Sequence, residues 1–254
     1  MEKHEYVNMY NNEDHHWWFV GLRDIVFSAV DDLRQAGDDF LLLDAGCGTG
    51  GVLSRLDGVK ACGFDIAAEA LAFCKVRNCD QVLQATICEI PFSKQSFDIV
   101  LSLDTLSYLD REDHDRALSN LYRVLKPGGS LVLNLPAYQW IMSRHDRAVG
   151  TRHRYTTGGL KLDLEKAGFS ITKMTYRNMF FFPAIVIKRL IDKRLRQGSE
   201  IESSDLKAVP KGFNALFRAV LIAENRLLSR ISFPFGLSIF CIAKKTTQSD
   251  GRDK

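Results

Sequence analysis

Short apolar runs alternate with amphipathic stretches through the first two thirds of the chain. Leu41-Leu42-Leu43 is too short for one face of a helix and is typical of a parallel strand that is buried on both sides. Residues 61–66, 81–86, 97–104 and 130–135 are further predicted strands, and residues 67–77 and 111–124 are predicted helices. Because strands and helices alternate, the pattern predicts an α/β fold with a doubly wound, mostly parallel sheet and helices on both faces.

A glycine-rich turn follows the first of these strands, in Asp44-Ala45-Gly46-Cys47-Gly48-Thr49-Gly50-Gly51. Glycines let the chain reverse direction and let a ligand approach the backbone. Val52, Leu53 and Leu56 then fall at helical spacing, so the predicted unit is strand, turn and helix. Such a unit presents free N–H groups beyond the carboxyl end of a strand, where α/β sheets bind nucleotides.

The type of nucleotide depends on the acid that precedes the turn. Gly46, Gly48 and Gly51 fit the spacing of a dinucleotide-binding turn, and Asp65 lies near the expected distance for a carboxylate that binds ribose. Asp44, however, stands at the strand tip, where an acid would repel a pyrophosphate. A carboxylate at this position favours a cationic ligand.

The turn and three later segments resemble class I S-adenosylmethionine (SAM)-dependent methyltransferases. Residues 44–50 resemble motif I of that family, and its other landmarks follow in order at 63–66, 91–100 and 125–129. The resemblance implies a seven-stranded, mostly parallel sheet with an antiparallel last strand, and SAM as cofactor, with S-adenosylhomocysteine as product. A non-catalytic SAM- or nucleotide-binding protein and an NAD-dependent oxidoreductase are the alternatives.

The same resemblance implies where the cofactor lies. Asp44 would face the cationic methionine end, and the carboxylate of Asp65 would accept hydrogen bonds from both ribose hydroxyls. Relatives often carry an aspartate for the adenine amino group where this chain has Thr86, so the Thr86 hydroxyl or the backbone of Ile87 would take that task. The predicted cofactor-binding residues are Asp44, Gly46, Cys47, Gly48, Asp65, Ile66, Thr86, Ile87, Ser102 and Leu103.

Residues 136–155, after the fifth predicted strand, combine histidines, arginines and aromatic residues in a loop of the kind that gathers substrate groups. They resemble the H-D…G…H-R-Y signature of one methyltransferase subfamily, often associated with cell-envelope and polysaccharide biosynthesis. Relatives often show a Glu-His pair where this chain has Ser107-Tyr108, so a base is missing there, and a histidine of the loop would act if the acceptor arrives protonated. An aspartate could orient that histidine, and arginines could clamp a carboxylate or phosphate. The predicted catalytic residues are His145, Asp146, His153 and Tyr155, and the predicted substrate residues are Tyr108, Tyr138, Trp140, Arg152 and Arg154. In the alternative interpretation, the arginines are solvated, the histidines are structural and the aromatic rings belong to the core.

Two segments lie outside the predicted core, residues 1–36 and residues 178–235. The first carries His16-Trp17-Trp18-Phe19 before an amphipathic helix, and this cluster is either a hydrophobic plug or a lid over the cofactor. It resembles the same subfamily, although the usual Arg-Arg pair is not kept at Leu22-Arg23. The second separates strands predicted at 169–176 and 237–243 by about sixty residues, where the family has a hairpin. The core would then be 37–177 plus 236–246.

The insertion has two amphipathic segments around a polar break at 198–205. The first begins with a Phe-rich run at 180–182 and continues into basic residues at 188, 189, 193, 194 and 196. The apolar faces of the two segments could pack on each other and on the sheet, form a substrate cap or homodimer surface, or lie on an anionic membrane surface through residues 180–230.

Composition limits the kinds of partner and the location that we expect for this protein. The chain has 254 residues, 46% hydrophobic and 26% charged, which is ordinary for a globular protein. A net charge of +3 is small, and we expect no nucleic-acid partner. The six cysteines form no C-x-x-C pair, so we expect no metal site. The polar N-terminus lacks a signal peptide and no apolar run is long enough to span a bilayer, so we expect a cytoplasmic protein, or one peripheral to the inner face of the membrane.

These observations predict an enzyme that transfers a methyl group from SAM by in-line displacement. The cofactor would supply the reactivity, and the protein would orient and desolvate the reactants. The expected acceptor is a small molecule or a lipid- or saccharide-linked molecule.

Overall fold

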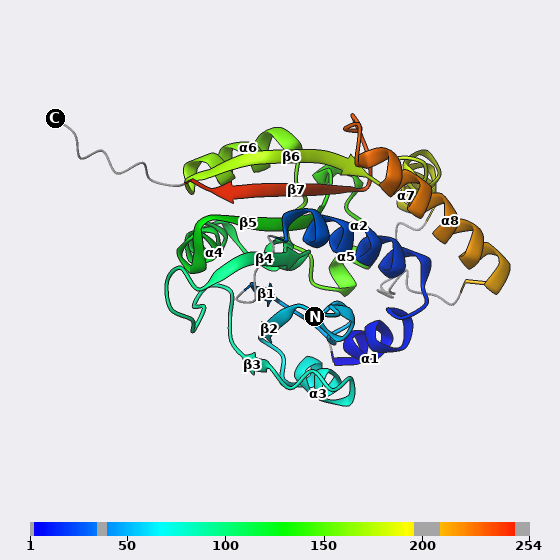
Figure 1. Ribbon diagram of the computed structural model, residues 1–254. Coiled ribbons are helices and arrows are strands. Elements are labelled where there is room, and N and C mark those ends of the chain that lie inside the picture. Colours follow the sequence, from blue (N-terminus) through cyan, green and yellow to red (C-terminus); the bar gives the residue numbers. More distant parts are fainter. Residues whose placement is uncertain (1–2, 35–39, 196–208, 247–254) are drawn as a thin grey trace.

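A seven-stranded sheet organises the computed structural model, which describes residues 3–34, 40–195 and 209–246. The strand order is β3-β2-β1-β4-β5-β7-β6 (Figure 1). The first five strands are parallel, and they are β1 (Leu41–Ala45), β2 (Lys60–Asp65), β3 (Val82–Gln84), β4 (Phe97–Leu103) and β5 (Leu125–Pro136). β7 (Ser238–Lys245) runs antiparallel between β5 and β6 (Phe169–Arg177). The predicted fold class is confirmed.

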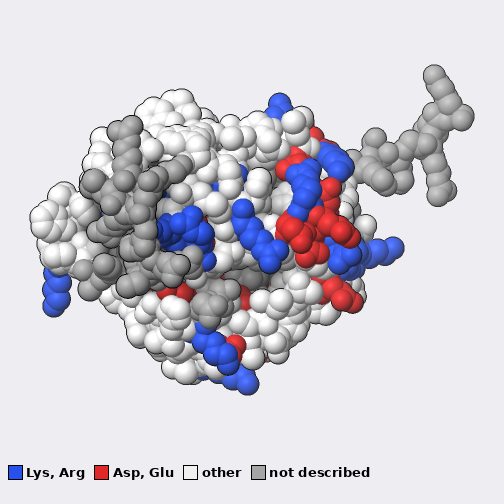
Figure 2. Space-filling view, turned by 180° about the vertical axis from the view of Figure 1, so that it is seen from behind, with Lys and Arg blue, Asp and Glu red and all other residues white. Residues whose placement is uncertain are grey.

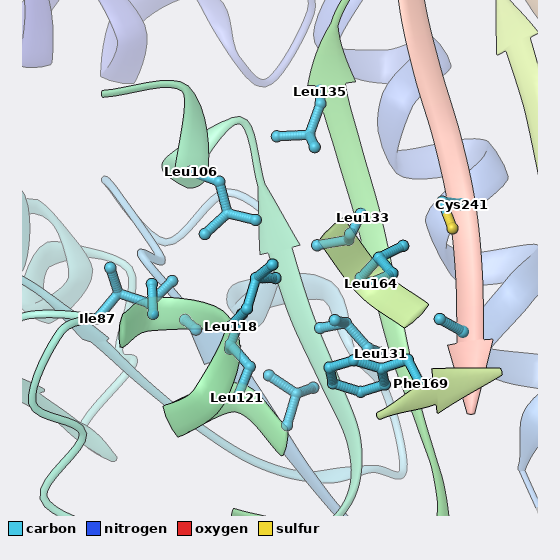
Figure 3. Packing of buried hydrophobic residues seen from close by; sticks show 14 of the residues in the cluster. Ile87, Leu106, Leu118, Leu121, Leu131, Leu133, Leu135, Leu164, Phe169 and Cys241 are labelled. Atoms are coloured by element: carbon cyan, nitrogen blue, oxygen red, sulfur yellow. The ribbon is translucent and has the colours of Figure 1, made fainter. Parts of the chain in front are cut away.

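Helices cover both faces of the sheet, and each face has its own apolar core. Successive residues of a strand point to opposite faces. Leu131 and Leu133 of β5 therefore pack with Leu118 and Leu121 of α4 (Arg111–Val124), on the face that α6 (Thr157–Lys166) also covers (Figure 3). Val132 points the other way and joins the core beneath α2 (Trp17–Leu33).

The prediction of a helix directly after the glycine turn is wrong. Only a short 3₁₀ turn, η1 (Leu53–Arg55), forms there, and Gly58 adopts a left-handed φ of +66° before β2 begins. The next helix, α3 (Ala68–Val76), lies within the predicted range. Thr156 caps α6 through a hydrogen bond from the Gly159 N–H to its hydroxyl, 3.2 Å long.

The insertion between β6 and β7 contains α7 (Phe182–Leu195) and α8 (Lys211–Leu228). α8 lies alongside α2 (Figure 1), and the Asn225 amide donates to the Gly21 carbonyl at 2.8 Å and to Asp24 Oδ2 at 2.9 Å. The predicted polar break at 198–205 lies outside the described residues. Among the helices of the described ranges, none combines the length and apolar character that crossing a bilayer requires.

A further helix, α1 (Lys3–Asn12), was not predicted, and it precedes the aromatic cluster. Short elements at the carboxyl ends of the strands complete the architecture. They are η2 (Thr105–Tyr108) after β4, and η3 (Gln139–Ile141) and α5 (Arg144–Ala148) after β5. Together with α1, these elements surround the edge of the sheet where the glycine turn lies.

Candidate active site

One cavity of about 1460 Å³ extends along this edge. At one end it is lined by the glycine turn and the tips of β1 and β2, and at the other by η2, α5 and the insertion helices. Small-molecule pockets usually enclose roughly 300–1,000 Å³. The cavity therefore has room for two ligands side by side, with one end built as a nucleotide site.

The glycine turn is held closely against the neighbouring strands. Gly46 has a φ of +90°, a conformation that side chains disfavour, and a Cβ there would meet the Thr105 side chain. The N–H groups of Gly46 and Cys47 both donate to the Phe64 carbonyl at 2.9 Å. The turn can therefore pass close to a ligand only because no side chain occupies position 46.

Asp65, at the tip of β2, is oriented by two backbone hydrogen bonds. Gly48 N–H donates to Oδ2 at 2.9 Å and Ala67 N–H donates to Oδ1 at 3.0 Å. Burial raises the pKa of the Asp65 carboxyl, although these hydrogen bonds oppose the rise. The carboxylate lines the cavity, at the position predicted for the ribose.

Asp44 is the least compensated charge at this end of the cavity. Its carboxyl is 2% exposed, and no cation of the described residues forms an ion pair with it. Burial and, to a lesser extent, the charges of Asp65 and Glu13 together raise its pKa to about 7. A positively charged ligand would relieve this clustering of acids, so the residues present fit the sulfonium and ammonium of SAM better than a pyrophosphate.

The N-terminal segment covers the glycine turn. Tyr6 and Met9 of α1 line the cavity, and the Glu13 carboxylate accepts a hydrogen bond from the Thr49 hydroxyl and pairs with Arg77 at 2.9 Å. Arg23 donates to the carbonyls of Glu13 and Asp14. These contacts place residues 3–14 over the cofactor end.

The aromatic cluster links this cover to the insertion. His16 caps α2 by accepting the Trp18 N–H, and the Trp17 ring lies 4.8 Å from Phe181 and 5.5 Å from Phe217 between ring centroids. His16, Trp17, Trp18 and Phe19 all line the cavity. The cluster is thus both packed and in contact with the site, so the two predicted interpretations are compatible.

The remaining predicted cofactor residues divide into two groups. Cys47, Ile66, Thr86, Ile87 and Leu103 line the cavity. The Thr86 hydroxyl accepts a hydrogen bond from the Cys88 N–H at 3.3 Å, so it already forms a contact within its own loop. Ser102 is fully buried in β4 and lies outside the cavity lining. The adenine contacts of Thr86 and Ile87 stay a prediction.

The predicted acceptor residues are brought together only in part. Asp146 and Arg154 are buried and form an ion pair of 2.6 Å, and Ser143 donates to the same carboxylate through its N–H at 2.6 Å and its hydroxyl at 2.8 Å. Burial alone would raise the pKa of Asp146, but Arg154 and Arg189 outweigh it and hold that pKa low. Arg154 also donates to the Ala137 carbonyl at 2.8 Å, so its guanidinium braces the loop.

The histidines are placed differently. The ring of His153 is exposed, lies outside the cavity lining and packs edge-on against Tyr155, while the Tyr155 hydroxyl donates to the Leu106 carbonyl at 3.0 Å. Arg152 is exposed beside Asp110, at 3.8 Å. The side chain of His145 lies outside the described residues. His153 and Tyr155 do not line the cavity, and the catalytic roles of both residues and of His145 stay predictions.

The other aromatic residues are also separated. Tyr108 and Trp140 line the cavity, and burial raises the pKa of the Tyr108 phenol. Tyr138 stacks on Tyr176 at 5.0 Å between ring centroids, away from the cavity lining. The cavity-lining residues that the sequence did not point to include Glu13 at the cofactor end and Asp104 at the acceptor end.

The strand order, the glycine turn and the acids at two strand tips define a Rossmann-like site of the SAM methyltransferase type. Residues 43–133 match the family model described as "Methyltransferase domain". The fold is similar to that of a SAM-dependent methyltransferase from Thermotoga maritima, with a TM-score of 0.57 at 20% identity over 96% of both chains. Residues 43–133 thus match a methyltransferase domain, and the acids and the glycine turn fit SAM as its cofactor.

Curated relatives match over the same region. The chain is 32% identical over 116 residues to a bovine protein named "Probable tRNA methyltransferase 9B", covering 45% of this chain and 24% of that protein. It is 36% identical over 105 residues to the malonyl-[acyl-carrier protein] O-methyltransferase of Yersinia pestis, covering 40% and 39%. The chain therefore spans between a quarter and two fifths of the length of these relatives.

These relatives correct one expectation. We expected no nucleic-acid partner from the small net charge, and this is wrong, because matched relatives are named as tRNA methyltransferases. Net charge reports on the whole surface and does not reveal a local basic site. The resemblance to the cell-envelope subfamily stays a prediction.

Proposed function

We propose that this protein transfers the methyl group of SAM to an acceptor that occupies the second end of the cavity. The observation that carries this proposal is the continuity of the cavity from Asp44 and Asp65 to η2 and α5. A methyl group can pass in line only if acceptor and cofactor lie within reach of each other in one shared space. The cofactor supplies an activated methyl group, and the chain supplies orientation and burial.

The acceptor end combines basic and aromatic side chains. Arg144 and Arg147 of α5 and Lys188 and Arg189 of α7 line it, together with Trp17 and Trp140. Figure 2 shows the acidic side chains of the rear face gathered over α4 and α6, apart from a basic group on the side of the insertion helices. Arginine and lysine favour carboxylate and phosphate groups.

This lining supports an acceptor that carries an anionic group beside an apolar part, such as a small acid or a phosphate of a lipid- or saccharide-linked precursor. A nucleic acid is the second candidate, since matched relatives are named as tRNA methyltransferases. Both candidates present phosphate or carboxylate groups, so the acceptor fraction must be identified directly.

Methyl-labelled SAM tests the proposal. The protein is incubated with separate small-molecule, lipid and RNA fractions of a cell extract, and Gly48→Val serves as a variant in which a side chain blocks the cofactor turn. We expect label in the small-molecule or lipid fraction with the native protein only. Label in RNA replaces the proposed acceptor with the second candidate. Label in none of the fractions, with S-adenosylhomocysteine binding intact, overturns methyl transfer in favour of non-catalytic binding.

We also propose that the insertion contacts an anionic membrane surface. Most large apolar side chains that the described residues expose lie on it, including Ile187, Leu190 and Ile191 of α7 and Phe213 and Leu216 of α8. Exposed Lys188, Lys211 and Arg218 accompany them. An apolar face flanked by basic residues suits the interface of anionic lipids.

Flotation with vesicles tests this contact. We expect the protein to float with vesicles that contain phosphatidylserine. With vesicles of pure phosphatidylcholine, we expect it to stay unbound in the bottom fraction. Leu190→Asp should abolish flotation, whereas Leu162→Asp, at a still more exposed site on α6, should not. Equal flotation of both variants, or none with the native protein, contradicts the membrane contact.

A further inference from the structure

Asp104 occupies a constrained position at the acceptor end of the cavity. It follows β4 directly and has a φ of +62°, a left-handed conformation that non-glycine residues adopt rarely. Its N–H donates to the Asn134 carbonyl at 2.7 Å, and its carbonyl accepts the Ser107 hydroxyl at 2.6 Å. These contacts hold the backbone so that the side chain lines the cavity.

The Asp104 carboxylate is oriented from behind. Asn134 donates to Oδ1 at 3.0 Å, and the Oδ1 of Asn134 accepts a hydrogen bond from Arg177 Nη1 at 3.2 Å. Arg177 is fully buried, so it cannot reach the cavity itself. Within the described part of the chain, no donor contacts Oδ2 of Asp104. One carboxyl oxygen is therefore fixed and the other is available to a ligand.

We propose that Asp104 is the base that takes the proton of the acceptor's O–H or N–H group during methyl transfer, an inference that rests on the proposed function. The acceptor oxygen or nitrogen forms a bond to the methyl carbon as the carbon–sulfur bond breaks. The sulfur keeps that electron pair and becomes the neutral thioether of S-adenosylhomocysteine. The proton passes to Oδ2 of Asp104 and then to water when the product leaves.

The surrounding charges support this role. The pKa of Asp104 is raised to about 6, because burial and the charge of Asp146 of α5 outweigh Arg177 of β6, the Asn134 hydrogen bond and Arg154, which lower it. The Tyr108 phenol also faces it, and burial keeps that phenol protonated at neutral pH. A base with a pKa near the working pH combines ionisation with proton affinity. His153 has no comparable place on the cavity wall.

Sinefungin and S-adenosylhomocysteine provide a test that needs no acceptor. Sinefungin carries an amino group where SAM has its transferable methyl, so its ammonium would meet Oδ2 of Asp104. Calorimetry with the native protein should show tighter binding of sinefungin, with the preference growing as pH rises through about 6. Asp104→Asn keeps the size of the side chain but removes the charge. We expect it to reduce the sinefungin preference about tenfold or more and to leave S-adenosylhomocysteine affinity within about threefold.

Asp110→Asn is the matched control, because Asp110 is an exposed N-cap that asparagine also supplies. Once the acceptor fraction is known, Asp104→Asn should also lower turnover about 10²–10⁴-fold while the control does not. An unchanged sinefungin preference in Asp104→Asn overturns the assignment of Asp104 alone. Failure of the native protein to bind either compound overturns the proposed function instead.

Discussion

Asp44→Asn should change two properties in opposite directions, because it should stabilise the folded protein at pH 8 and weaken SAM binding. In the folded protein the Asp44 carboxyl has a pKa of about 7, against an ordinary value of 3.8. Between these two pH values the folded chain keeps a proton that the unfolded chain has lost. The free energy of unfolding therefore falls as pH rises across this window.

The magnitude follows from the two pKa values. The difference between 3.8 and about 7, at about 1.4 kcal/mol per pH unit, makes the ionised carboxylate cost up to about 4 kcal/mol of folding stability above pH 7. About 2 kcal/mol of this builds up between pH 5.5 and pH 7. Asparagine has the same shape without the charge. When pH is raised from 5.5 to 8, the free energy of unfolding of Asp44→Asn should therefore rise by about 2 kcal/mol relative to that of the native protein.

Urea unfolding of the ligand-free proteins at pH 5.5 and pH 8 measures this gain. Asp104 also has a raised pKa and contributes to both proteins, so only the difference between them reports on Asp44. The same variant should bind SAM at least about tenfold more weakly at pH 8, because the sulfonium loses its buried counter-charge. An Asp44→Asn variant that gains no stability at pH 8, or that binds SAM normally, refutes this account of the acid.

Three further changes test the packing around the site. Gly51→Ala places a methyl group against the Glu13 carboxylate and should displace the N-terminal segment. The affinity for S-adenosylhomocysteine, measured by calorimetry, should fall about fivefold or more. Unchanged affinity would show that the N-terminal segment does not contribute to cofactor binding. Trp17→Ala removes ring contacts to Phe181, which precedes α7, and to Phe217 of α8, and should lower the free energy of urea unfolding by about 1–3 kcal/mol. No loss would mean that the aromatic link is dispensable. Arg154→Met leaves Asp146 without its nearest cation and should cost about 3–5 kcal/mol in the same assay, and a neutral result would contradict the bracing role.

The cofactor half of the site was predictable because its signals are local. Asp44, the glycine turn and the tip of β2 are each set by a few consecutive residues, and Asp65 reaches Gly48 across one parallel pairing. The helix expected after the turn failed because Val52 and Leu56 satisfy helical spacing without enough chain before Gly58. Spacing alone does not report how many residues remain before the next strand.

The acceptor half depends on contacts that no local pattern carries. Glu13 meets Thr49 only because α1 folds back over the turn, and Asp104 acquires its burial from β5 and β6. His153 and Arg154 are adjacent in sequence, yet one is exposed and the other is buried with Asp146. The composition of residues 136–155 predicted a functional loop, but tertiary packing decides which side chains reach the cavity.

Calorimetric titration of the purified protein with SAM and with S-adenosylhomocysteine at pH 8 tests the central claim most directly. We predict saturable binding of both compounds at one site per chain, with loss of both in Gly48→Val. The absence of heat with either compound, or equal binding by Gly48→Val, would contradict the assignment of the glycine turn and its acids as a site for a cationic sulfur nucleoside.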